Sequence, residues 1–127
     1  MKLREYFEKA KGRGMIATSD SKGKVGVAVY ARPHFINEKM VAFIMADRLI
    51  HKNLESNPYA AYLFMESGDR YVGKRLYLTK VKEEKNSELI DQIRRRESCP
   101  VDEGYKKGTR FLVYFKIDKV LPLIGAK

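Results

Sequence analysis

Three side chains that could bind an anion stand close together in the sequence, directly after an apolar stretch. Arg48, His51 and Lys52 are spaced i, i+3 and i+4, so that on a helix they would be neighbours on one face. The first turn of such a helix would also offer unpaired backbone N–H groups and the positive end of the helix dipole. Two or three charge-assisted hydrogen bonds of about 1.5–3 kcal/mol each could hold a phosphomonoester at micromolar concentration. The segment 47–58 is therefore a candidate phosphate site.

The same segment contains signals that begin and end a short helix. Asp47 is a residue type that caps helix N-termini, and Pro58 disfavours the helical conformation at Asn57. Ile50 and Leu54, four residues apart, would point towards the core, which leaves the basic side chains facing outward. The alternative interpretation is a solvated basic face, which a chain this basic would also contain.

Length and composition indicate one domain over residues 1–127. Hydrophobic residues make up 44% of the chain, including eight tyrosines and six phenylalanines, which is enough for a core. No apolar run approaches the roughly 18 residues that a membrane span requires. The single cysteine, Cys99, cannot form an internal disulfide, which fits a reducing compartment. We therefore expect a cytoplasmic protein with no membrane partner.

The net charge of +10 raises the question of a nucleic-acid partner, because Lys and Arg supply most non-specific affinity for phosphate backbones. The distribution of charge argues against it. Basic residues are spread along the chain among sixteen acidic ones, and only the arginines at 94–96 form a tight cluster. That cluster closes a predicted helix over 86–97, where cations complement the helix dipole. A nucleic-acid-associated protein with salt-dependent binding stays as an alternative.

The rest of the sequence predicts mainly β structure. Apolar residues at helical spacing predict an opening helix over 3–10, ended by Gly12 and Gly14. In the stretch 25–30, valines alternate with Gly26, Ala28 and Tyr30, so a ligand or another strand could approach the small-residue side. Apolar runs and period-two alternation between turn signals predict six strands, over 14–19, 25–30, 40–46, 59–65, 71–81 and 110–120. Six strands with helices at the edges predict a closed or split antiparallel barrel.

Taken in order, several of these motifs resemble a known family. They are Gly14-Met-Ile-Ala-Thr-Ser19, a turn with Gly23, the valine-rich strand, an apolar strand, and Lys52-Asn-Leu-Glu-Ser-Asn-Pro58 before the next strand. Their order and spacing are similar to those of the pyridoxamine 5′-phosphate oxidase-like, FMN-binding split-barrel family, over nearly the whole chain. Ile50-His-Lys-Asn53 looks like the phosphate-binding turn of its small FMN-binding members. The resemblance implies a mainly β, six-stranded antiparallel split β-barrel of Greek-key type with flanking short helices, and a homodimer.

The resemblance also implies FMN as the cofactor and a set of residues that contact it. Residues 30–34 would line the flavin, 45–48 would offer backbone groups to the ring edge, and 51–53 would contact the phosphate. Arg32 would lie near the phosphate or the ribityl chain, and the segment 121–125 could cover the partner's flavin. The implied cofactor residues are Tyr30, Arg32, His34, Met45, Ala46, Asp47, Arg48, His51, Lys52 and Asn53. The simpler alternatives are a surface role for Arg32, a loop role for His34 and a core role for Tyr30.

Departures from the family pattern limit the expected activity. The C-terminal arginine and histidine with which the full oxidases bind substrate are not found, so we do not expect a full pyridoxamine phosphate oxidase. The sequence also lacks zinc-site spacing, phosphate-loop and dinucleotide fingerprints, and a serine-nucleophile elbow. We interpret the chain as an FMN-binding homodimer, a small oxidoreductase or electron carrier with a redox partner or small-molecule substrate. The alternative is a non-enzymatic module that holds FMN, deazaflavin or haem.

Overall fold

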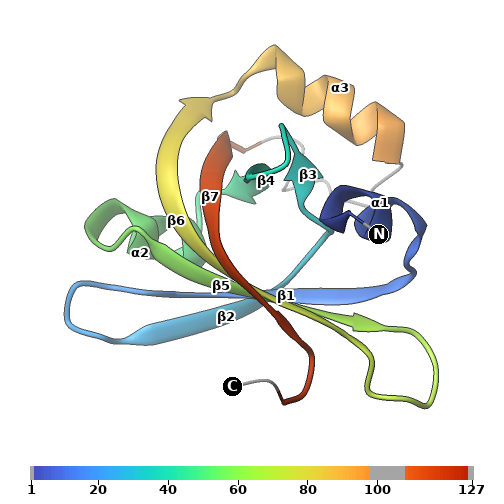
Figure 1. The fold of residues 1–127 in the computed structure, drawn as a ribbon. Helices are drawn as coiled ribbons and strands as arrows, with labels where there is room; N and C mark the ends of the chain where they lie inside the picture. Colours follow the sequence, from blue (N-terminus) through green and yellow to red (C-terminus); the bar gives the residue numbers. More distant parts are fainter. Residues whose placement is uncertain (1, 98–107, 126–127) are drawn as a thin grey trace.

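A computed structural model describes residues 2–97 and 108–125, and it shows a strongly twisted antiparallel sheet that curls around one main core (Figure 1). The strands are β1 (Gly12–Ser19), β2 (Val25–Tyr30), β3 (His34–Phe35), β4 (Met40–Ala46), β5 (Tyr59–Glu66), β6 (Gly73–Lys85) and β7 (Arg110–Pro122). Their order in the sheet is β2-β1-β5-β6-β7-β4-β3. The helices are α1 (Leu3–Lys9), α2 (Leu49–Ser56) and α3 (Glu88–Glu97).

The predicted mainly β, antiparallel architecture is confirmed, and the predicted strand count is wrong by one. All six predicted strands are present, and β3 is a seventh, with only two residues and no pattern that sequence periodicity could detect. The sheet is not closed, because β2 and β3 stand at its two edges without pairing to each other. β6 continues to Lys85, four residues beyond the predicted end, since its charged last residues pair with β7.

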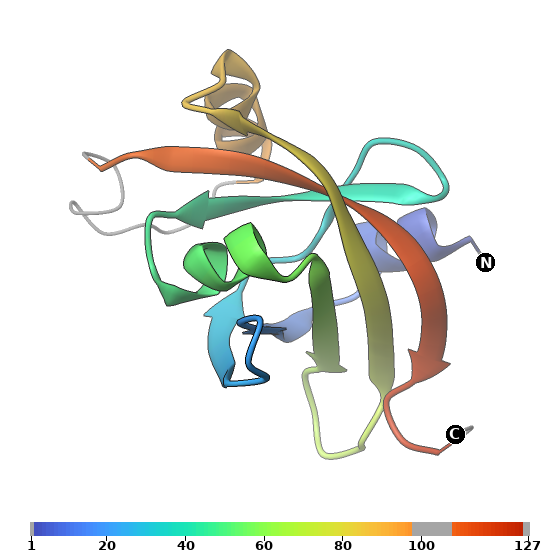
Figure 2. The ribbon, with the colours of Figure 1, turned by 90° about the vertical axis from the view of Figure 1, so that its left-hand side faces the viewer.

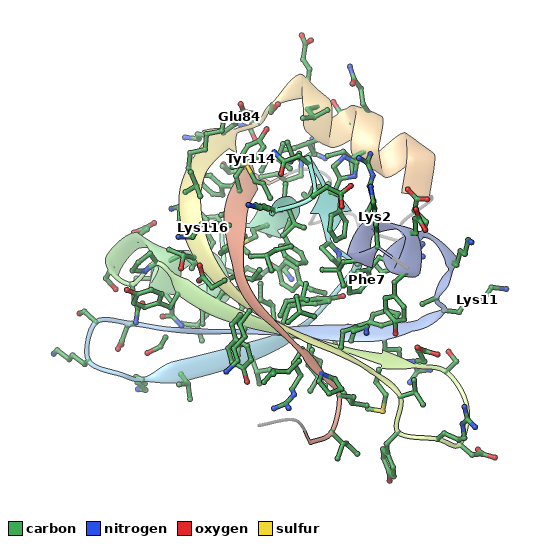
Figure 3. All side chains as sticks on the ribbon, viewed as in Figure 1. Lys2, Phe7, Lys11, Glu84, Tyr114 and Lys116 are labelled. Carbon is green, nitrogen blue, oxygen red and sulfur yellow. The ribbon has the colours of Figure 1, made fainter. Side chains whose placement is uncertain are left out.

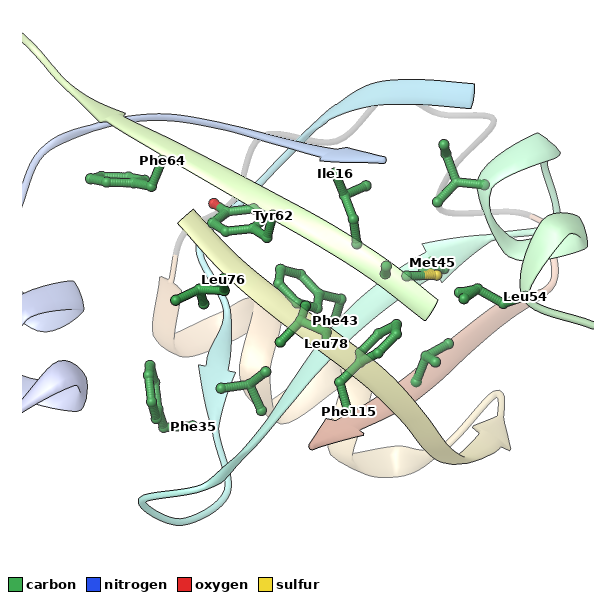
Figure 4. Packing of buried hydrophobic residues seen from close by; sticks show 14 of the residues in the cluster. Ile16, Phe35, Phe43, Met45, Leu54, Tyr62, Phe64, Leu76, Leu78 and Phe115 are labelled. Carbon is green, nitrogen blue, oxygen red and sulfur yellow. The ribbon is translucent and has the colours of Figure 1, made fainter. Parts of the chain in front are cut away.

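The core forms because alternate residues of the strands point to the inside of the curled sheet. Tyr62 of β5, Phe43 of β4 and Phe115 of β7 meet there, with ring centroids 5.1 Å and 5.9 Å from Phe43 (Figure 4). Each such side chain contributes about 1.5–3 kcal/mol through burial. α1 closes one side of this core with Phe7 (Figure 3). The Phe7 ring lies edge-on to Phe64, with the ring centroids 5.2 Å apart.

α3 covers a second, smaller cluster on the other face of β4 and β7. Ile90 and Ile93 pack there with Ala42, Leu112 and Tyr114. The helix begins at Glu88, two residues after the predicted start, and none of the helices described is long and apolar enough to cross a membrane. The predictions for the side chains at 94–96 and for Cys99 lie outside what the structure describes.

Candidate functional site

α2 lies outside the sheet, beside the β1–β2 hairpin and directly after β4 (Figure 2). The helix begins at Leu49, and its N-cap is Arg48, with extended backbone (φ −135°, ψ −176°) and no side-chain capping bond. The prediction that Asp47 caps the helix is therefore wrong: the chain stays extended one residue further than the sequence suggested. Since no described side chain caps α2, the amides of its first turn are open to another acceptor.

His51 does not lie on the exposed face of α2. Its side chain is only 2% exposed, and its Nε2 lies 3.0 Å and 3.2 Å from the two carboxylate oxygens of Glu83 on β6. The imidazole stacks on Phe111 of β7, with centroids 3.7 Å apart and planes 11° apart. The predicted outward basic face is therefore wrong for His51, because β6 and β7 cover the side of the helix that carries it.

Asn53 is also buried, against β1. Its Nδ2 donates to Oγ1 of Thr18 at 3.2 Å, and the Thr18 hydroxyl donates to the carbonyl of Ile50 at 3.1 Å. The structure thus brings together the two motifs that carried the family resemblance, Ala-Thr-Ser and Lys-Asn-Leu. It uses the Asn53 side chain to dock α2 on the sheet, rather than presenting it at the exposed face with Lys52.

Arg48, the N-cap, and Lys52, in the first turn of α2, are both exposed, and the backbone N–H of Lys52 donates to the carbonyl of Arg48 at 3.0 Å. We call these two side chains, with the uncapped amides of the first turn, the α2 anion site. Asp47 and Leu49 are exposed beside it, and the carboxylates of Asp47 and of Glu55, three residues after Lys52 on α2, oppose an anion. The residues present fit a phosphate monoester, because Arg48, Lys52 and the helix N-terminus all favour an anion at the first turn, where Glu55 of the second turn does not reach.

The predicted flavin-lining residues occupy the strands next to α2. Tyr30, half-buried at the end of β2, has its ring edge-on to Phe43 of β4 at 6.2 Å, so β2 and β4 approach each other there. β3 pairs with β4 only at Val41 and Ala42, which leaves the rest of β4 without a β3 neighbour up to the start of α2. In that stretch Met45 is fully buried and Ala46 is half-buried. We call this edge of β4, where the end of β2 approaches it, the split between β2 and β4. In sequence, the α2 anion site follows it directly.

Two of the predicted cofactor residues, Arg32 and His34, lie between β2 and β4 in the chain. Arg32 donates through Nη1 to the carbonyls of Phe7 and Ala10, at 2.7 Å and 3.2 Å, and so fixes the end of α1. Its hydrogen bonds are made to α1 and not to α2. His34 is half-buried in β3, opposite Ala42 of β4.

Glu83 is a residue that the sequence did not single out. It stands in the stretch 80–85, which consists mainly of charged residues and so indicates a solvated strand end. Burial alone would raise the pKa of its carboxyl, but hydrogen bonds from Lys80 and His51 outweigh burial and lower the pKa. Glu83 is therefore ionised at neutral pH, and no sequence signal marked it as the partner of His51.

The outer face of β2, β1, β5 and β6 is apolar and exposed. Val25, Val27 and Val29 are 75%, 69% and 79% exposed and lie on the same side of β2. The strand register continues that side across the sheet, since residues directly opposite each other share a face. The apolar members of the outer face are Met15, Ala17, Val25, Val27, Val29, Tyr59, Ala61, Leu63, Met65 and Tyr77, and the register places Arg13 and Arg75 on the same face. Exposed contiguous apolar surface of this kind is typical of an interaction site.

No protein-family model matches this sequence, and no curated protein sequence matches it significantly. Several solved structures match the chain in fold. An FMN-binding protein from Syntrophomonas wolfei subsp. wolfei matches with a TM-score of 0.78 at 18% identity, over 99% of this chain and 86% of the other. An F420 reductase matches with a TM-score of 0.72 at 14% identity, over 92% and 94%. HutZ, a haem storage protein from Vibrio cholerae, matches with a TM-score of 0.61 at 20% identity, over 94% and 90%.

The chain has the split-barrel fold of pyridoxamine 5′-phosphate oxidase-like proteins. Candidate oxidases of that name from Lactobacillus delbrueckii and Listeria innocua also match, with TM-scores of 0.63 and 0.65 at 12% and 10% identity. The resemblance inferred from the sequence is thereby confirmed at the level of the fold. These distant fold relatives are named for different cofactors, so the fold alone does not identify the cofactor of this chain.

Proposed function

We propose that this split barrel binds FMN, with the phosphate at the α2 anion site. The observation that carries the proposal is the uncapped first turn of α2 with Arg48 and Lys52 exposed together beside it. Arg48 can hold a phosphate through two parallel N–H bonds, and Lys52 adds a second charge. The flavin ring would then lie along the split between β2 and β4, near Tyr30 and the end of β4. Fold relatives named for FMN and F420 support a flavin-type ligand.

We further propose a homodimer whose interface is the outer face. The face is large and apolar, and its central strands carry the small residues Ala17 and Ala61, which would let another sheet approach closely. Its charged members are Arg13, opposite Met65, and Arg75, opposite Leu63, whose guanidinium donates to the carbonyls of Pro122 and Gly125 of its own chain. A second copy fits these features, because an isologous contact needs only a self-complementary surface. β2 borders both the outer face and the flavin split, so the partner would lie beside the cofactor.

The segment 121–125, predicted to cover the partner's flavin, is held by its own chain. Arg75 donates through Nε to the carbonyl of Pro122 and through Nη2 to that of Gly125, both at 2.9 Å. Leu121 is buried, while Ile124 is 65% exposed. A contact between Ile124 and a partner subunit remains part of the proposal for the dimer.

In this proposal the protein is a small oxidoreductase or electron carrier of the cytoplasm. The flavin supplies the redox chemistry, and the protein supplies binding, orientation and electrostatics. The electron donor and acceptor would be a redox partner or a small molecule.

The second candidate is a non-enzymatic module that holds deazaflavin or haem, as fold relatives named for F420 and for haem storage suggest. The surroundings of His51 argue against it as a haem ligand. A haem iron commonly takes an axial histidine, and one of the two histidines of the chain, His51, is buried with its Nε2 bonded to Glu83. The phosphate-binding features of α2 suit FMN and a phosphorylated deazaflavin equally.

An absorption spectrum of the purified protein tests the proposed function. We expect flavin bands, either as purified or after incubation with FMN and removal of the free ligand. Separate incubations with a deazaflavin and with haem test the alternatives. A haem spectrum that survives gel filtration, without any retained flavin, would overturn the flavin proposal in favour of the storage module.

A further inference from the structure

His51 and Asn53 hold α2 from opposite sides. Successive residues of a helix are about 100° apart around its axis, so these two side chains point roughly 200° apart. His51 contacts Glu83 and Phe111 on β6 and β7, while Asn53 contacts Thr18 on β1. Both are almost fully buried. Polar contacts on two opposite sides fix the rotation of α2 about its own axis.

That rotation decides which side chains reach solvent. Lys52 stands between the two buried residues in sequence, about 100° from each around the axis, and its backbone N–H donates to the carbonyl of the N-cap residue Arg48. A rotation of α2 about its own axis by about 100°, the angle between successive residues, would bring His51 or Asn53 to the exposed face in place of Lys52. The α2 anion site therefore depends on the contacts that hold His51.

Glu83 determines how His51 is held. Its carboxylate also accepts a hydrogen bond from Lys80, which keeps it ionised and leaves it only acceptor capacity. The Nε2 atom of His51 must then carry a hydrogen, and this N–H donates a hydrogen bond to the Glu83 carboxylate. Nδ1 lies 3.9 Å from a carboxylate oxygen of Glu55 and makes no hydrogen bond within the described residues. Glu83 is thus the hydrogen-bond partner that anchors the imidazole against Phe111.

We propose that Glu83 is a positioning residue for the α2 anion site: through His51 it sets the rotation of α2 that presents Lys52 and the amides of the first turn, beside the N-cap Arg48, to a phosphate. The proposal rests on the proposed function, since the phosphate of FMN is the anion. Without Glu83, the buried Nε2–H would lack its acceptor, and the imidazole would regain one by moving off Phe111 or by taking the other tautomer and turning Nδ1–H towards Glu55, now 3.9 Å away. Such a displacement turns α2 and changes the phosphate contacts more than the contacts of the flavin ring.

The test compares Glu83→Ala with Glu84→Ala as a matched control. Glu84 is the next residue of β6, and its carboxylate accepts a hydrogen bond from Tyr114 rather than contacting α2. Affinity for FMN and for riboflavin is measured by flavin fluorescence, and backbone amide shifts of residues 48–52 are measured by NMR without ligand. Riboflavin lacks the phosphate, so the ratio of the two affinities isolates the anion site. Glu83→Gln keeps an acceptor for His51 and serves as the conservative rescue.

We expect Glu83→Ala to weaken FMN binding by about tenfold and to leave riboflavin binding within about twofold. The amides of 48–52 should shift in Glu83→Ala and stay in place in Glu84→Ala, and Glu83→Gln should recover most of the FMN affinity. An equal loss for both flavins would show that Glu83 only stabilises the fold and would overturn the proposal. Unchanged FMN affinity with unmoved amides would overturn it as well.

A different result is expected if the proposed function itself, and not the role of Glu83, is wrong. If the wild-type protein binds neither flavin, the function proposed above is wrong, whatever Glu83 does. The amide shifts then decide the positioning role alone: movement specific to Glu83→Ala supports it, and its absence overturns it.

Discussion

Thr18 and Asn53, 35 residues apart in the chain, form a buried hydrogen bond that docks α2 on β1. The Thr18 hydroxyl accepts from Asn53 and donates to the carbonyl of Ile50, so one side chain satisfies two buried polar groups of the helix. This pair therefore joins the helix that carries the anion site to the sheet that forms the core.

Thr18→Val should destabilise the protein by about 1–3 kcal/mol, because it leaves Asn53 Nδ2 without this acceptor in a buried place. Ser19→Ala is the matched control, since the Ser19 hydroxyl bonds only to the carbonyl of the next residue near the surface. Urea denaturation measures both. A loss in Thr18→Val no larger than in Ser19→Ala would show that the bond contributes nothing to docking.

Arg48→Ala and Lys52→Ala should each weaken FMN binding by about 1.5–3 kcal/mol and leave the fold intact, because both side chains are exposed and would bind the phosphate by charge-assisted hydrogen bonds. Isothermal titration with FMN measures the loss, and circular dichroism checks the fold. Lys22→Ala, in the exposed β1–β2 turn, is the control. Unchanged affinity in both variants would place the phosphate away from α2.

Val27→Lys should convert the proposed dimer to a monomer, because it puts a charge at the centre of the apolar strand of the outer face. Sedimentation equilibrium measures the mass, which for the wild type should be twice 14.7 kDa. Val81→Lys is the control: this 53%-exposed valine lies on β6 beyond the end of its pairing with β5. A wild-type mass of 14.7 kDa would contradict the shared interface.

Salt should tighten the same dimer. Each copy carries a net charge of +10, so the two copies repel each other at long range while the apolar face attracts. Screening removes the repulsion and leaves the apolar contact. Sedimentation at low and high ionic strength checks this expectation, and a dimer that dissociates with added salt would point to an interface held by ion pairs instead.

The stabilising effect of Glu83 should disappear in acid. Its pKa in the folded protein is lowered below the ordinary value of 4.5, so its contribution to stability is fully present above pH 4.5 and is lost as the pH falls through the folded pKa. The difference in unfolding free energy between wild type and Glu83→Gln should therefore be constant near neutral pH and shrink below pH 4.5. Urea denaturation over this pH range measures it. A difference that stays constant down to pH 2 would contradict the lowered pKa.

The sequence predicted the fold well because strand periodicity and turn residues are local signals. The strand Met40–Ala46 was predicted with its observed bounds, since its apolar run is flanked by polar residues on both sides. β3 was not predicted because two residues cannot show a period. The extension of β6 was not predicted because its residues are mostly charged, which is typical of a solvated segment, although they pair with β7. These misses concern contacts between strands that lie far apart in the sequence.

The site was predicted less completely. Arg48 and Lys52 are both exposed, as expected for basic residues, but Arg48 is the extended N-cap and not a helical residue, so the predicted i, i+4 spacing on one helix face does not apply to it. The burial of His51 depends on Glu83 and Phe111, which come from strands 32 and 60 residues later, and helix periodicity contains no information about them. Basic residue type favoured solvent exposure for His51, but a histidine can be buried when a carboxylate and an aromatic ring receive it.

A titration of flavin fluorescence with the purified protein tests the central claim most directly. We predict saturable binding of one FMN per chain with a dissociation constant at or below about the micromolar range, and binding of riboflavin at least about tenfold weaker because it lacks the phosphate. No saturable binding of FMN would contradict the proposed cofactor. Equal affinity for FMN and riboflavin would contradict a phosphate bound by Arg48 and Lys52.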